Sequence, residues 1–148
     1  MTLAILARRE VVAAARAWCG TPYRHQASRR GIGTDCLGLV RGLCRDLFGC
    51  EPEAPPPYAP DWAEAGRREM LAEGLGRHFG AIDPAAFGAG DVLLFRWRAH
   101  LPAGHLGIAT GAGRMVHAHA GAAVAEVAIG RWWSRHLAFA FSFPGISD

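Results

Sequence analysis

Residues 33–49, GTDCLGLVRGLCRDLFG, predict a helix that carries a cysteine in its first turn. Apolar side chains recur along it at helical spacing, Thr34 can act as the N-cap, and Gly49 is placed to end it. The free amides and the dipole at a helix start favour negative charge, so we expect this position to stabilise a thiolate at Cys36. A structural cysteine that packs inward, as expected for Cys44, is the other interpretation of such a position.

Patterns on either side of this helix indicate the fold class. Helical patterns come first and antiparallel strand patterns follow, an order typical of α+β folds. The length of 148 residues suits one domain, 1–148. The further helices predicted are Leu3–Cys19, closed by Gly20, and Asp61–Phe79; the strands are Asp91–Phe95, His105–Thr110, Arg114–Ala120 and an alternating apolar run from Leu137 to Phe143.

Composition and charge narrow the possible partners. The formal net charge is +3, and Lys and Arg never form a dense run, so nucleic-acid binding is not expected. No stretch approaches the roughly 20 apolar residues that span a bilayer, so no membrane insertion is expected. Residues 1–10 contain Arg8, Arg9 and Glu10 where a secretory signal has its apolar middle, which predicts synthesis in the cytoplasm without a signal peptide.

The four cysteines do not suggest a disulfide framework. Cys36 and Cys44 fall about two turns apart on one predicted helix, too far to be bridged. Three of the four lie in or beside apolar helical patterns, where a reduced cysteine behaves as a small core residue. The next segment, Glu51–Pro60, contains five prolines and is expected to be extended or turning rather than helical.

His105 is the candidate base for the cysteine, and the predicted hairpin supplies its partner. A cysteine nucleophile needs a base within hydrogen-bond reach, and the base needs an orienting group. If the turn is centred on Gly111, His117 lies directly opposite His105, close enough for one imidazole to orient the other. If it is centred on Ala112, His119 takes that place. Strand alternation puts both candidates on one face, so periodicity leaves both open.

The same histidines raise the question of a metal. His117 and His119 offer two ligands, and His105 or Cys36 would complete a zinc site. No paired-cysteine spacing and no helical His-Glu-x-x-His accompanies them. We therefore expect neither a metal nor another cofactor.

Five short blocks together resemble the NlpC/P60 cysteine peptidases. They come in the order in which the family has them and span most of the chain. The blocks are Gly20-Thr21-Pro22-Tyr23, Gly33-Thr34-Asp35-Cys36-Leu37-Gly38-Leu39-Val40, Gly90-Asp91-Val92, His105-Leu106-Gly107-Ile108 and Met115-Val116-His117-Ala118. Residues 20–28 and 35–42 are most similar to the subgroup encoded in tail-gene clusters of phages and gene transfer agents.

The resemblance implies a papain-like α+β fold, in which N-terminal helices pack on a central antiparallel sheet. It implies that Cys36 is the nucleophile, His105 the base and His117 the third member of the triad. It also implies that Tyr23 lies near the oxyanion, where its hydroxyl would donate to developing charge. Asp35 matches a family position beside the substrate, although it would also strengthen the helix start.

The function implied by the resemblance is hydrolysis of an amide bond in a peptidoglycan stem peptide, between D-glutamate and diaminopimelate. Many family members have Ser directly after the cysteine, where this chain has Leu37, so a different peptide preference is expected. The partners implied are the peptidoglycan peptide and the proteins of a phage-like tail or baseplate, with action in the periplasm or cell wall. Two other functions stay open: a structural tail component with a relic site, and a thiol acyltransferase on the same scaffold.

Overall fold

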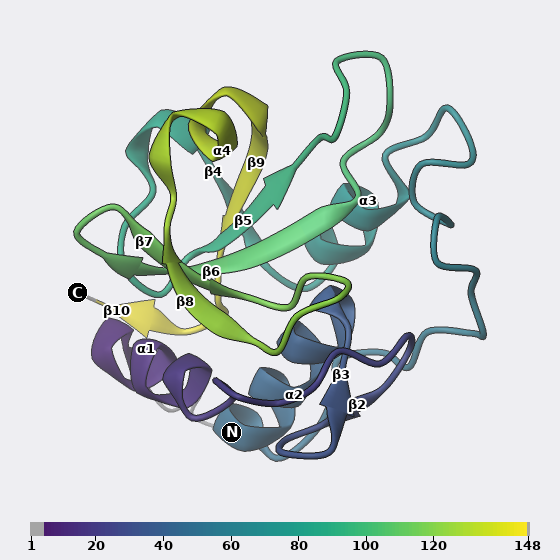
Figure 1. The fold of residues 1–148 in the computed structure, drawn as a ribbon. Helices are drawn as coiled ribbons and strands as arrows, with labels where there is room; N and C mark the ends of the chain where they lie inside the picture. Colours follow the sequence, from purple (N-terminus) through teal and green to yellow (C-terminus); the bar gives the residue numbers. More distant parts are fainter. Residues whose placement is uncertain (1–4, 148) are drawn as a thin grey trace.

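A six-stranded antiparallel sheet forms the centre of the molecule. The computed structural model describes residues 5–147. The strand order is β4-β9-β5-β6-β7-β8, and every neighbouring pair is antiparallel (Figure 1). The strands are β4 (Gly80–Ile82), β5 (Val92–Phe95), β6 (His105–Gly111), β7 (Arg114–His117), β8 (Ala125–Ala128) and β9 (Leu137–Ser142). The predicted α+β class is confirmed.

Three helices bury one face of the sheet. They are α1 (Arg8–Arg16), α2 (Cys36–Phe48) and α3 (Met70–Gly76). Their apolar side chains share one core with alternate residues of the central strands, among them Val92, Leu94, Leu106, Ile108 and Val116. Period-two alternation explains why these strand residues all point to the helices.

The opposite face is covered by α4 (Gly130–His136) and the short 3-10 turn η1 (Pro84–Ala86). A second cluster contains Leu93, Phe95 and Met115, with Trp133 of α4 packed against it. His105 and His117 belong to this alternation, because their strand neighbours Ala109 and Met115 lie in the second cluster.

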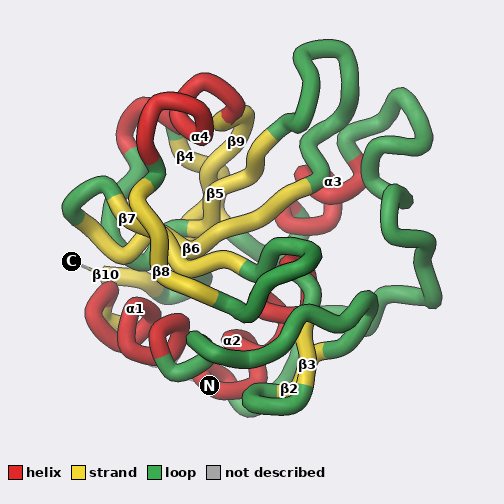
Figure 2. Tube along the Cα trace, viewed as in Figure 1, coloured by secondary structure: helices red, strands yellow, loops and turns green. Residues whose placement is uncertain are grey.

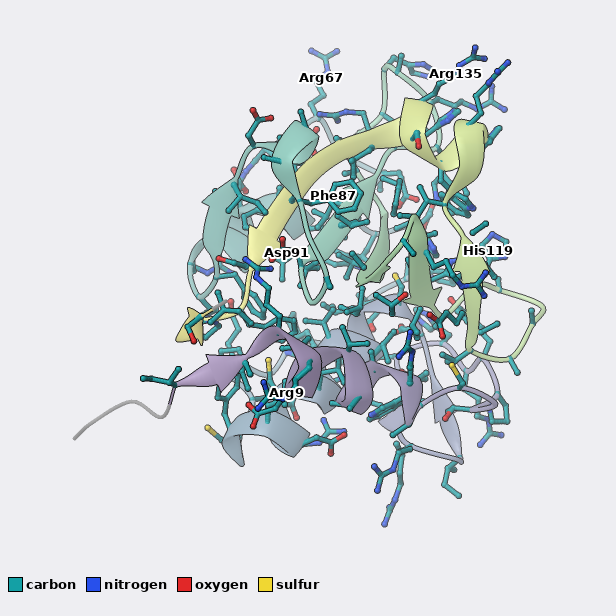
Figure 3. The ribbon with its side chains drawn as sticks, turned by 90° about the vertical axis from the view of Figure 1, so that its left-hand side faces the viewer. Arg9, Arg67, Phe87, Asp91, His119 and Arg135 are labelled. Carbon is teal, nitrogen blue, oxygen red and sulfur yellow. The ribbon has the colours of Figure 1, made fainter. Side chains whose placement is uncertain are left out.

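Two short strand pairs involve the N-terminal half of the chain. Strand β1 (Leu6–Ala7) pairs in parallel with β10 (Ile146–Ser147) near the chain ends, and β2 (Ser28–Arg29) pairs with β3 (Gly33–Thr34) before α2. In Figure 3 Asp91 lies toward α1. Its carboxylate forms an ion pair with the guanidinium of Arg8 in that helix, at 2.9 Å. The β2–β3 ribbon places the start of α2 beside the sheet.

Two predicted helices are shorter than expected. The helix predicted for Leu3–Cys19 is confined to Arg8–Arg16, because Leu6–Ala7 joins a strand pair and residues 17–20 turn away; Leu3 lies outside the described residues. The helix predicted from Asp61 begins only at Met70. Residues 60–67 form turns instead, since Gly66 disfavours a helix and the apolar stripe starts at Leu71.

The proline-rich segment 51–60, here called the strap, is part of a long excursion between α2 and α3 (Figure 2). It carries no helix or strand, as its five prolines predict. A cavity of about 520 Å³ lies between the strap, α2 and α3. Leu37, Val40 and Cys44 of α2 line this cavity, so the residue after the candidate nucleophile faces an apolar hollow.

Candidate active site

The start of α2 is fixed by Asp35. The N-cap is Asp35, whose Oδ1 accepts a 2.7 Å hydrogen bond from the backbone N–H of Gly38. The expectation that Thr34 caps this helix is therefore wrong; the Thr34 hydroxyl is buried and donates to the carbonyl of Asp35. A carboxylate caps a helix start at least as well as a hydroxyl and adds favourable charge there. Gly49 ends the helix in the left-handed conformation, as predicted.

The second oxygen of Asp35 holds two other segments. Its Oδ2 accepts from the backbone N–H of Gln26 at 2.7 Å and from the hydroxyl of Tyr58 at 2.5 Å. His25 reinforces the same contact, because its Nε2 lies 2.6 Å from the carbonyl oxygen of Tyr58. Asp35, the residue directly before Cys36, therefore links the strap to the start of α2. The contact of Tyr58 with Asp35 could not be predicted from the sequence, since no local pattern connects the two residues.

The sulfur of Cys36 lies against the backbone on both sides of His105. Its Sγ is 4.0 Å from the carbonyl oxygen of Gly104, and the N–H of Leu106 is directed at it. These two groups are open to the sulfur because β7 ends at His117, one residue before it would pair with Leu106. No hydrogen bond among the described residues joins Sγ to an imidazole nitrogen.

The surroundings of Cys36 favour its neutral thiol. Loss of hydration raises the pKa of the thiol to about 12, and the neighbouring Asp35 carboxylate raises it further. Hydrogen bonds from the N–H groups of Leu106 and Leu37 oppose this rise only in part. Desolvation and a like charge therefore act against the thiolate that the helix start was expected to hold.

His105 is hydrogen-bonded to His117. Nε2 of His105 and Nδ1 of His117 are 2.8 Å apart, with the two rings nearly perpendicular. The hairpin has the register centred on Ala112: Gly107 pairs with His117, which would place His119 opposite His105. His105 and His117 are therefore not the directly opposite pair that a turn centred on Gly111 would give. The contact is instead diagonal, which still lies within reach of long side chains.

His119 lies outside this hydrogen bond. It follows the end of β7, is exposed, and its Nδ1 contacts the carbonyl oxygen of Ala120 at 3.2 Å. Figure 3 shows it at the periphery of the molecule. Its ring centroid is 5.6 Å from that of His105, so His119 lies beside the His105–His117 pair without taking part in its hydrogen bond.

Two tryptophans enclose His105. The ring of Trp133 in α4 stacks on the imidazole, with centroids 5.1 Å apart and planes 24° apart, and Trp97 lies at 5.1 Å on another side. Burial lowers the pKa of His105 well below its usual value and lowers that of His117 to about 4; neighbouring histidines add to both shifts. Both imidazoles are therefore neutral near pH 7. The tryptophans were missed from the sequence, since only the α4 contact brings Trp133 to the site.

Tyr23 lies close to Cys36. It forms an isolated bridge with Thr34, immediately before Asp35 and Cys36, and is partly exposed. Burial, followed by the charges of Cys36 and Asp35, raises the pKa of its phenol. Its hydroxyl makes no hydrogen bond within the described part of the chain, and so can still donate to a ligand.

Within residues 5–147, no group of three His, Cys, Asp or Glu side chains is disposed to hold a metal ion. None of the described helices has the length and hydropathy required to cross a bilayer.

Comparison with known proteins agrees with this architecture. The NlpC/P60 family model matches residues 20–141. The chain therefore belongs to the NlpC/P60 family, the family of cysteine peptidases that its motifs resemble. A search of curated proteins finds none that matches this chain.

Solved structures show the same fold. The NlpC/p60 domain of the peptidoglycan hydrolase SagA has a TM-score of 0.63 at 23% identity, over 93% of this chain and 100% of that domain. An NlpC/P60 family protein from Bacillus cereus gives 0.65 at 18% identity, over 93% of this chain and 40% of that protein. NlpC1 from Trichomonas vaginalis gives 0.60 at 17%, over 92% and 43%. The chain thus spans less than half the length of the latter two.

Proposed function

We propose that the protein is a cysteine peptidase with Cys36 as nucleophile, His105 as general base and His117 as the group that orients it. The observation that carries this proposal is the position of Sγ against the backbone flanking His105, while Nε2 of that histidine is bound to His117. Nδ1 of His105 is then the nitrogen left for the thiol proton. Family membership and the fold support the same assignment.

The protonation states define the first step. Cys36 and His105 are both neutral at rest, so attack on an amide carbonyl requires transfer of the thiol proton to Nδ1 of His105 as the C–S bond forms. The His105 Nε2–H donates to Nδ1 of His117, which stabilises the imidazolium. The backbone N–H of Cys36 and the hydroxyl of Tyr23 would meet the oxyanion. His105 then protonates the leaving amine, and water hydrolyses the thioester.

The substrate we propose is a peptidoglycan stem peptide, cleaved between D-glutamate and diaminopimelate. Support comes from family membership and from the likeness to the domain of a peptidoglycan hydrolase. Leu37 replaces the Ser of many family members and lines the apolar cavity beneath the strap. The substrate preference should therefore shift toward peptides with an apolar group at the position that contacts Leu37.

The decisive test compares peptidoglycan digested with the wild-type protein and with Cys36→Ala. We expect mass spectrometry to show stem-peptide fragments with the wild type and a rate lower by roughly 10³-fold or more with Cys36→Ala. Cys19→Ala is the matched control, because that cysteine is exposed and lies outside the site. Undiminished cleavage by Cys36→Ala would remove the sulfur from the mechanism. Fragments heavier by water identify hydrolysis, whereas an acyl group kept on an acceptor identifies an acyltransferase.

We also propose that the enzyme is carried on a phage-like tail and opens the cell wall locally. Its support is the likeness of residues 20–28 and 35–42 to the tail-cluster subgroup. Purified particles should contain the protein, and particles with Cys36→Ala should assemble but penetrate the wall poorly. Full penetration by such particles would favour a purely structural role.

A further inference from the structure

Residues 96–100 and 130–136 form a basic and aromatic patch, here called the basic surface. The two segments lie side by side, since the backbone N–H of Arg96 donates to the carbonyl oxygen of His136 at 2.8 Å. Together they contain four Arg, two His and three Trp, and neither contains an Asp or Glu. A surface of this composition attracts an anionic partner, although the whole chain carries a formal net charge of only +3.

Three of the four arginines have no acidic partner. Arg98, Arg131 and Arg135 are exposed, and none of them forms an ion pair within the part of the chain that the structure describes. Arg96 is the exception, because it pairs with Glu69. Figure 3 shows Arg135 at the upper edge of the molecule, away from α1. These guanidinium groups are therefore available to carboxylates of another molecule.

Trp132 adds apolar area and a defined shape to this charge. Its side chain is 47% exposed, and its ring is stacked on that of His136 with centroids 3.8 Å apart. An exposed indole can pack on the apolar face of another ring. Beside the stack lies a hollow of about 300 Å³, lined by Arg96, Ala99, Arg135, His136 and Leu137.

The basic surface is continuous with the side chains that enclose His105. Trp97 and Trp133 each have their ring centroid 5.1 Å from that of the His105 imidazole. Trp132 contacts both of these indoles, at 5.9 Å and 4.7 Å. In the proposed mechanism His105 protonates the leaving amine, so the part of the substrate beyond the scissile bond starts next to this surface. In a cross-linked wall that part carries carboxylates and stays attached to a neighbouring glycan strand.

We propose that the basic surface docks the peptidoglycan polymer, with Arg98, Arg131 and Arg135 on stem-peptide carboxylates and Trp132 on a sugar ring. The choice of polymer rests on the proposed function. Nucleic acid would satisfy the charge, but only a polymer that is cleaved beside His105 is brought to this surface by the reaction. The contacts lie beyond the residue that supplies the leaving amine, so the surface retains the polymer and takes no part in bond cleavage.

The test measures binding of the Cys36→Ala protein, which should not cleave the polymer, to purified insoluble peptidoglycan. Sedimentation over a range of protein concentrations gives Kd. Adding Arg131→Gln and Arg135→Gln together should weaken binding roughly 3- to 30-fold, as expected for two exposed charge pairs. Adding Trp132→Ala instead should weaken it roughly tenfold. Peptidoglycan whose carboxylates have been amidated should bind the Cys36→Ala protein at least as weakly as intact peptidoglycan binds the double arginine variant.

Arg9→Gln with Arg30→Gln is the matched control, because it removes the same charge from two other exposed arginines. This pair should leave Kd unchanged; an equal loss would mean that net charge alone retains the polymer, and would overturn the proposal. Undiminished binding by the variants of Arg131, Arg135 and Trp132 would overturn it as well. Tighter binding of a single-stranded oligonucleotide than of peptidoglycan would show that the partner is wrong.

Cleavage assays in the Cys36 background separate docking from a role in the active site. Arg131→Gln with Arg135→Gln should slow digestion of insoluble peptidoglycan and leave the rate on soluble L-alanyl-γ-D-glutamyl-diaminopimelate unchanged. An equal loss on both substrates would place the arginines among the groups that bind the short peptide, and docking would be wrong. If the Cys36→Ala protein binds the polymer as expected but the wild type cleaves neither substrate, the proposed function fails and the docking surface stands.

Discussion

Cys36 shows how burial and helix position compete at one residue. A helix start lowers a thiol pKa, but loss of hydration at this half-buried cysteine and the neighbouring Asp35 carboxylate together raise its pKa to about 12. The resting pair is therefore a thiol and a neutral imidazole. In the proposed mechanism, activation has to accompany substrate binding, when the thiol proton would move to His105.

Alkylation of Cys36 should reflect this state. In the folded protein we expect iodoacetamide labelling of Cys36 to be slow at pH 6–8 and to rise continuously through and beyond pH 9, since the thiolate is the reacting species and its pKa is raised. Peptide mass spectrometry after timed labelling gives the rate. In the urea-unfolded protein the same cysteine should titrate near its ordinary value of 9.0. A labelling rate that levels off below pH 7 would show a stabilised thiolate and contradict the burial argument.

Helix α2 owes its position to two close contacts. Gly42 lies under the Trp18 ring, and a Cβ atom there would stand 2.1 Å from Cζ2 of the indole. Trp18 is 1% exposed, and its indole N–H donates to Asp46 of the same helix at 2.9 Å. The segment after α1 is thus joined to the helix that carries Cys36 at its start.

Gly42→Ala should therefore destabilise the protein by about 1–3 kcal/mol, because overpacking outweighs the better helix propensity of alanine. Urea unfolding followed by circular dichroism measures the change. Gly74→Ala in α3 is the control: its nearest neighbour is the flexible end of Arg77 at 3.5 Å, so it should be neutral or stabilising. A stabilised Gly42→Ala would mean that Trp18 can move aside at little cost.

The helices and strands also show which features local sequence patterns can predict. Helix α2 was predicted because its apolar spacing and Gly49 are local signals, and strand β5 because its residues are all apolar. The hairpin register was left open, since it depends on an irregular turn in which Ala112 adopts a φ of 53°. Helix α4 and the contact of Tyr58 with Asp35 were missed, because long-range packing decides both.

At the scale of the whole molecule, the site lies where the sheet meets its two coverings. Cys36 comes from the helical layer, His105 and His117 from the sheet, and Trp133 from α4 on the other face. Enclosing two neutral histidines in this way makes the fold sensitive to acid. Each must stay unprotonated in the folded protein at a pH where the unfolded chain binds a proton.

Stability should accordingly fall as pH drops from 6.5 to 4. The pKa of His117 is about 4 in the folded protein against 6.5 when exposed, so the unfolded state gains more protons over this interval. The contribution of His117 is at most about 3 kcal/mol. Urea unfolding at pH 7 and pH 4 should show a smaller loss for His117→Gln than for the wild type. His100→Gln, which changes an exposed histidine, should lose as much as the wild type; an equal loss in all three proteins would assign the acid sensitivity to other groups.

The crowding of indoles over the histidines has a practical consequence. Trp97, Trp132 and Trp133, three of the five tryptophans in the chain, contact one another and the imidazoles. Protonation or occupancy of the site changes the surroundings of most of the chromophores at once. Intrinsic fluorescence can thus follow events at this centre without any attached dye.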